Sequence, residues 1–183
     1  MAQSTASAPP PPSLEPLPSV WRRIAAPAAL TLAMTLARLY AELAQLPGFI
    51  ASTEGGPRGA VLGIWWLAPV LGWWFARDIV GRSDRPKKAL AKTLIAYGFA
   101  ARLPIVVITW IALEKGDAWN THYTKFGDDP DLIPSSLAAK LGLTAVAQLG
   151  LQVFVWTLGT GMLVGWLWMR KQRKLPPAPA PRS

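Results

Sequence analysis

Cysteine is absent from this chain, and histidine occurs once, at His122. The lack of thiols excludes disulfide bonds, thiolate zinc sites, iron–sulfur clusters and cysteine nucleophiles. One histidine per copy also excludes paired-imidazole haem ligation and multi-histidine metal centres within a single chain. We therefore expect no resident metal centre and no cysteine-based catalysis.

Charged residues are also scarce, at 16% of the chain against about 25% in a typical soluble domain. Hydrophobic residues make up 51% of the 183 residues, and the mean hydropathy is +0.26. The length leaves room for one domain. These figures predict an integral membrane protein.

Four long apolar stretches account for most of the hydrophobic residues. A bilayer core of about 30 Å needs about 20 helical residues, and each stretch is near or above that length. The sequence therefore predicts an all-α, polytopic membrane protein with four transmembrane helices. The expected helices cover residues 24–46, 59–76, 89–113 and 136–169, with a long outer loop over 114–135.

Both ends of the chain are rich in proline. Residues 1–19 hold six of the 18 prolines and no basic residue, and residues 175–183 read LPPAPAPRS. Such segments cannot pack a core, so we expect disordered tails that flank a transmembrane domain over 20–174.

Most of the 19 basic residues lie on one side of the expected helices, and the formal net charge is +9. By the positive-inside rule, this side is cytoplasmic and holds both termini. The clusters indicate contact with anionic lipid at the cytoplasmic face of an inner (plasma) membrane, and no nucleic-acid partner is expected. They comprise Arg22, Arg23, Arg77, Arg82, Arg85, Lys87, Lys88, Lys92, Arg170, Lys171, Arg173, Lys174 and Arg182.

Polar residues lie inside three of the apolar stretches and form stripes in the first and the fourth. The first helix carries Thr31, Thr35, Arg38, Glu42 and Gln45 at intervals of three or four residues, which puts all five on one face. This face is expected to avoid lipid.

The other polar residues lie at a similar depth. Arg102 is near the middle of the third helix, and Gln148 and Gln152 follow one another at a helical interval in the fourth. An arginine at mid-bilayer costs about 2.5–3.5 kcal/mol on insertion scales and needs a partner. We expect Glu42 to be shared by Arg38 and Arg102, with the glutamines completing the hydrogen bonds. This intramembrane cluster is either a structural network, the favoured interpretation, or a site for an ion or anionic substrate.

Small residues four positions apart mark one face of each of two helices. They let backbones approach closely, which is how helices associate in lipid. Internal packing is the favoured interpretation, and a dimer face is the alternative. The residues concerned are Gly59, Gly63, Ala68 and Gly72 in the second helix and Gly161 and Gly165 in the fourth.

Ten tryptophans are an unusual number for this length, and two adjacent pairs, Trp65-Trp66 and Trp73-Trp74, lie too close together to reach both membrane surfaces. The favoured interpretation is that these side chains only fill space against lipid. A pocket for a lipid, quinone or pigment is the alternative, although no ligating residue in any span supports a cofactor.

The outer loop holds the only histidine and a group of aromatic residues. Trp119, His122, Tyr123 and Phe126 are of the kind that concentrates interface energy, so we expect them to contact a partner. The loop matches no complete calcium-loop motif, and the chain carries no nucleophile elbow or phosphate loop. No catalytic residues are therefore expected.

These features favour a non-catalytic integral membrane protein, an accessory, structural or partner-binding subunit of a larger membrane complex. The alternative is a small oligomeric transporter or channel that uses Arg38, Glu42 and Arg102. A membrane-embedded enzyme acting on a lipid ranks third.

Overall fold

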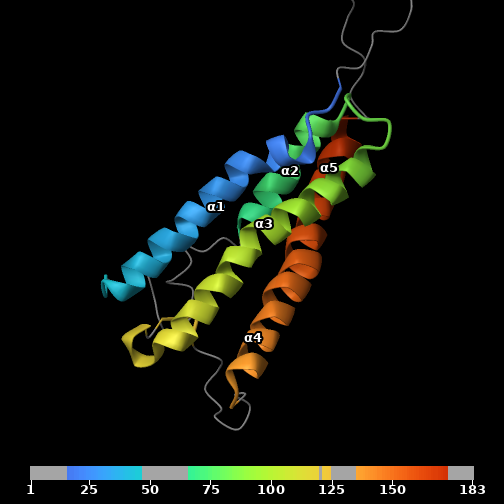
Figure 1. Ribbon diagram of the computed structural model, residues 1–183. Coiled ribbons are helices and arrows are strands. Elements are labelled where there is room, and N and C mark those ends of the chain that lie inside the picture. The colour runs from blue at the N-terminus through green and yellow to red at the C-terminus, as the bar shows by residue number, and fades with distance from the viewer. Residues whose placement is uncertain (1–15, 47–65, 120, 125–134, 173–183) are drawn as a thin grey trace, which may run out of the picture.

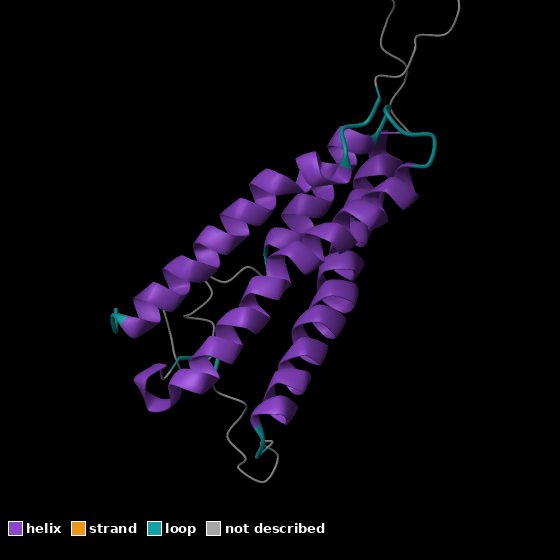
Figure 2. Ribbon diagram, viewed as in Figure 1, coloured by secondary structure: helices purple, strands orange, loops and turns teal. Residues whose placement is uncertain are grey.

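The computed structural model describes residues 16–46, 66–119, 121–124 and 135–172. All regular structure in these ranges is helical, as predicted (Figure 2). The elements in chain order are α1 (Val20–Leu43), α2 (Leu67–Ile79), α3 (Pro86–Lys115), a 3₁₀ turn (Gly116–Trp119), α4 (Leu137–Ala145), a π-helical segment (Val146–Thr160) and α5 (Gly161–Gln172).

Three helices of the described chain are long and apolar enough to cross a membrane. They are α1 with 24 residues, α3 with 30, and the continuous run of α4, the π-helical segment and α5, which we call the C-terminal rod (Leu137–Gln172), with 36. The second expected span falls partly outside the described residues, since 59–65 are among those not described. Its described part, α2, has 13 residues and continues to Ile79 rather than ending at residue 76.

The ends of α1 lie before those expected from the apolar stretch. The helix begins at Val20 because Ser19 caps it, its side chain accepting a hydrogen bond from the Arg22 backbone N–H at 3.4 Å. It ends at Leu43 because Gln45 takes a left-handed conformation with φ of 52°, and the Leu46 N–H turns back to the Ala41 carbonyl at 2.9 Å. The predicted range of 24–46 therefore needs a shift toward the N-terminus.

In Figure 1, α3 lies between α1 and the C-terminal rod, and α2 packs beside α5. The start of α1, the turn between α2 and α3, and the end of α5 gather at one end of the bundle. We call this the basic end, because Arg22, Arg23, Arg82, Arg85, Lys87, Lys88, Arg170 and Lys171 lie there. The end of α1, the end of α3 and the start of α4 form the opposite end, which we call the loop end.

Two apolar clusters hold the helices together. The larger one lies toward the basic end and joins α1, α2, α3 and α5 through buried side chains that include Ile24, Phe75, Leu94 and Met169. The smaller one lies at the loop end and joins Leu39, Ile105, Ile108, Ala112 and Tyr123. The candidate functional residues lie around this second cluster.

Glycines set the closest approach between α2 and the C-terminal rod. A Cβ atom added to Gly72 would overlap the Gly161 carbonyl oxygen and lie 2.6 Å from the Gly161 Cα. A Cβ on Gly165 would lie 2.9 Å from the Gly72 carbonyl oxygen. The two small-residue faces therefore meet each other inside one chain, with Ala68 close to Gly161, whereas Gly59 and Gly63 lie outside the described residues.

Candidate functional site

The carboxylate of Glu42 is the centre of a polar cluster at the loop end. Its Oε1 accepts a hydrogen bond from Arg38 Nε at 3.0 Å, one turn earlier on α1. Its Oε2 accepts from His122 Nδ1 at 2.7 Å and from the His122 backbone N–H at 3.0 Å. The Glu42 side chain is fully buried, so these donors replace the water that it would otherwise bind.

This cluster fastens the segment after α3 to the end of α1. A carboxylate only accepts hydrogen bonds, so the neutral His122 ring carries its proton on Nδ1 and donates it to Glu42. Burial lowers the pKa of His122, and nearby Arg38 acts in the same direction, while Glu42 acts against it. The ring is therefore neutral at pH 7 and acts as a neutral donor.

Tyr123 lies directly beside His122, with 3.8 Å between the ring centroids. Its side chain is buried against Leu39, Ile105 and Ile108, and Trp119 packs against the same cluster. Burial raises the pKa of the Tyr123 hydroxyl well above its usual value. The phenol therefore stays protonated.

The expected partner contacts of the loop stay a prediction, and the structure shows where three of the four residues lie. Tyr123 is buried in the bundle, whereas His122 binds Glu42 of the same chain and leaves 23% of its side chain exposed. Trp119 is half-buried against the same apolar cluster, and Phe126 lies outside the described residues. The buried Glu42 orders this segment, because it accepts hydrogen bonds from both the ring and the backbone N–H of His122.

Arg102 lies in the interior of α3 and is 8% exposed. Its Nη1 donates to Gln148 Oε1 on the π-helical segment at 3.4 Å. The expected sharing of Glu42 is not observed, since no ion pair joins Arg102 to Glu42 in the described part of the chain, where His122 occupies the second carboxylate oxygen. The cluster is thus divided into an Arg38–Glu42–His122 group and an Arg102–Gln148 pair.

Gln152 is half-buried and makes no hydrogen bond with another described side chain. Its distance from the pair has a local cause. Residues 146–160 close their turns with bonds to the fifth residue rather than the fourth, and the buried line of the rod shifts by one residue, so that Val153 rather than Gln152 follows Gln148. The buried positions that follow Gln148 on the rod are Val153 and Thr157.

A second polar line runs from the cluster toward the basic end. Thr31 and the Tyr97 hydroxyl lie 2.7 Å apart and join α1 to α3, and Thr35 donates to the Thr31 carbonyl at 2.9 Å. The stripe on α1 thus faces α3, as its spacing predicts. Tyr97 was missed by sequence reasoning, because it lies five residues before Arg102 and so does not share the face of α3 that a spacing of three or four defines.

Metal ligation finds no support in the described ranges, where no group of three or more histidine, aspartate or glutamate side chains gathers. Comparisons with protein-family models, curated proteins and solved structures found no match to this chain.

Proposed function

We propose that this chain is a non-catalytic integral membrane protein that acts as an accessory or partner-binding subunit of a larger complex in the inner (plasma) membrane. Both termini lie on the cytoplasmic side in this proposal, in agreement with the concentration of arginine and lysine at the basic end. The four-span topology of the sequence prediction is part of the same proposal.

One observation carries the proposal. Only 11% of the most apolar window of the C-terminal rod is buried inside the chain, against 44% for α3. The rod contacts its own chain along one line and presents large apolar side chains elsewhere, including Val146, Leu151 and Val155. A helix that leaves so much apolar surface exposed can accept a neighbouring helix without any rearrangement of the fold.

The polar cluster supports a structural rather than a catalytic role. Glu42 on α1 holds His122 of the segment after α3, and Thr31 holds Tyr97 of α3, so these groups join elements of the bundle to one another. Buried polar groups in membrane bundles commonly have this function, with each interhelical hydrogen bond contributing about 0.6 kcal/mol.

A photocrosslinking amino acid at Val155 tests the proposal, and Val107 on α3 provides a matched control. Both are exposed valines in apolar helices, at 64% and 49%. We expect a single discrete crosslink to another membrane protein from Val155 in native membranes and none from Val107. Crosslinks to lipid alone, or only to a second copy of the chain, would contradict the subunit role.

A small transporter or channel is the second candidate, and Arg102 favours it. The guanidinium is buried in the interior of α3 and makes one hydrogen bond, 3.4 Å long, to another described residue. Its other N–H donors suit a small anion. Purified protein in liposomes would conduct chloride or nitrate on this account, and Arg102→Leu would abolish the flux, whereas equal leakage with and without protein would exclude it.

A further inference from the structure

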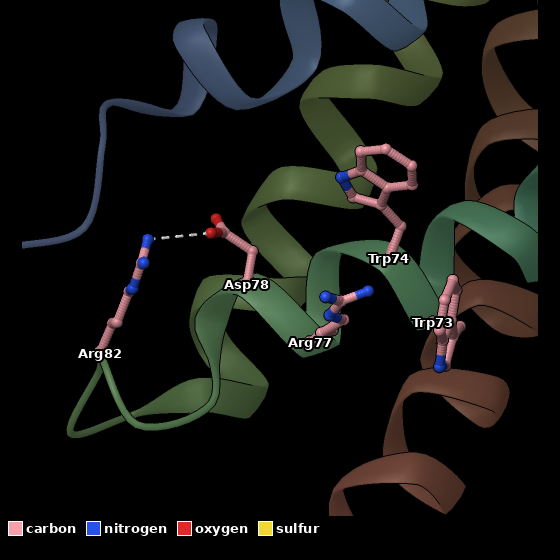
Figure 3. Close-up of a pocket in the computed structure, with 5 residues that line it drawn as sticks. All are labelled: Trp73, Trp74, Arg77, Asp78 and Arg82. Carbon is pink, nitrogen blue, oxygen red and sulfur yellow. Dashed lines mark hydrogen bonds and ion pairs between the residues drawn. The ribbon is translucent and has the colours of Figure 1, made fainter.

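A second candidate site lies away from the polar cluster, at the basic end. Two tryptophans, two arginines and an aspartate from the last turns of α2 and the turn after it line an open cavity of about 430 Å³. Figure 3 shows Trp73, Trp74, Arg77, Asp78 and Arg82 around it. The volume lies within the range of small-molecule sites, about 300–1,000 Å³.

Arg77 lies between Asp78 on one side and the two tryptophans on the other (Figure 3). Its guanidinium carbon is 5.9 Å from the centroid of the Trp73 ring, a cation–π contact that holds the charge beside the indole. No hydrogen bond or ion pair joins Arg77 to another residue that the structure describes. Its five N–H donors are thus available to a ligand.

The charges of the cavity favour an anion. Asp78 is neutralised by Arg82, whose Nη1 lies 3.1 Å from the carboxylate, so the positive charge of Arg77 is in excess. Arg23 on α1 does not line the cavity but carries a further positive charge near Asp78. Two of its guanidinium nitrogens, Nε and Nη1, are buried without a hydrogen-bond partner among the described residues.

An apolar track leads away from the cavity along α2. Trp66, Val70 and Trp73 or Trp74 are exposed and follow one another at intervals of three or four residues, on the same face as Arg77. The track runs along α2 from the cavity at the basic end toward the middle of the bundle. A ligand that joins a phosphate to an acyl chain would place the phosphate in the cavity and the acyl chain along the track.

We propose that this cavity binds the phosphate headgroup of an anionic phospholipid, whose acyl chain lies along the Trp66–Trp74 face of α2. The phosphate accepts hydrogen bonds from Arg77, and Trp73 and Trp74 lie at the level of the glycerol, where indoles are favoured. This is a specific site for one lipid, distinct from the diffuse attraction of anionic lipid to the basic end, and it does not depend on the subunit role.

The test uses the full chain in neutral detergent, titrated with phosphatidylglycerol in the presence of excess phosphatidylcholine. Native mass spectrometry counts the lipids that each chain retains. Arg77→Gln removes the charge from an exposed side chain, so the fold is expected to persist. We expect the tightest phosphatidylglycerol to bind at least about tenfold more weakly, because a hydrogen bond to a charged group is lost.

Arg170→Gln is the matched control. Arg170 also lies at the basic end and contacts a tryptophan, with its guanidinium carbon 5.5 Å from the Trp166 ring centroid, but it does not line the cavity. Unchanged binding in Arg170→Gln, with weakened binding in Arg77→Gln, supports the site. Equal weakening in both variants would reduce it to diffuse electrostatics and overturn the proposal.

Two further arms separate the lipid from free phosphate. Val70→Asn interrupts the apolar track without changing the charge, and it should weaken phosphatidylglycerol binding while Arg77 is intact. Inorganic phosphate alone should bind far more weakly than the lipid. Phosphate that binds as tightly as the lipid, or no preference for phosphatidylglycerol over phosphatidylcholine, would overturn the assignment.

Discussion

The contact between Gly72 and Gly161 makes a sharp prediction about stability. In Gly72→Ala, the new methyl group would meet the Gly161 carbonyl oxygen and lie 2.6 Å from its Cα and 2.8 Å from its carbonyl carbon. These are backbone atoms, which no side-chain rotation can move aside, so α2 and the C-terminal rod must separate. Overpacking of this kind costs about 1–3 kcal/mol.

Gly142→Ala is the matched control. Gly142 lies in α4, and a Cβ added there meets nothing within 4 Å. The same substitution therefore brings only the ordinary gain of alanine over glycine in a helix, about 0.5–1 kcal/mol. Gly72 also lies in a helix, so this gain applies to both variants and cancels, and Gly72→Ala should be less stable than Gly142→Ala by about 1–3 kcal/mol in the free energy of unfolding.

Unfolding in a lipid bicelle, followed by steric trapping or by helical circular dichroism during titration with denaturing detergent, measures this difference. Both variants need the same lipid composition, because stability in a bilayer depends on it. Equal stability of Gly72→Ala and Gly142→Ala would refute the glycine-mediated contact and with it the placement of α2 against the rod.

Three further predictions concern the polar groups. Glu42→Gln should destabilise the docked loop by about 1–3 kcal/mol, because Arg38 loses its anion, and hydrogen exchange at residues 121–124 should accelerate. Burial lowers the pKa of His122 below its usual 6.5. Docking of residues 121–124 on α1 should therefore be complete above about pH 6.5 and weaken as the pH falls through the folded-state pKa. The NMR resonance of the single histidine reports that pKa. Arg102→Leu should favour membrane insertion by about 3 kcal/mol in a translocon assay, since no acidic side chain among the described residues pairs with the charge; an unchanged or less favourable insertion free energy would show that Arg102 has an acidic partner.

The helical architecture follows from the spacing of apolar and polar residues. Thr31, Thr35 and Glu42 recur at helical intervals on α1, and all three are buried, because a polar stripe cannot face lipid. Fourfold spacing likewise located the small-residue faces, of which Gly72, Gly161 and Gly165 meet. Periodicity thus predicts which face of a helix is buried.

Partner choice within the cluster could not be predicted in the same way. Both Arg102 and His122 carry donors that suit Glu42, and the similar depth of Arg102 and Glu42 along their helices favoured Arg102 in the sequence prediction. The turn after α3 decides in favour of His122, because it brings both the ring and the backbone N–H to one carboxylate. Such a contact depends on the path of the chain between residues 116 and 124, which carries no periodic signal.

The π-helical segment also has no periodic signal in the sequence. Its 15 residues read as a regular apolar helix, and the altered hydrogen bonding moves Val153 rather than Gln152 to the buried face, against Gly98. Tight packing between Gly98 and Val153 is a tertiary effect, so a local pattern at fourfold spacing places the glutamine incorrectly.

The mass of the particle in native membranes tests the subunit role most directly. The chain can be extracted with its surrounding lipid into nanodiscs at native expression and measured by native mass spectrometry. The account predicts a particle whose protein mass is not a whole multiple of the 19.8 kDa chain, because a different protein is bound. A monomer, or a particle made only of copies of this chain, would contradict it.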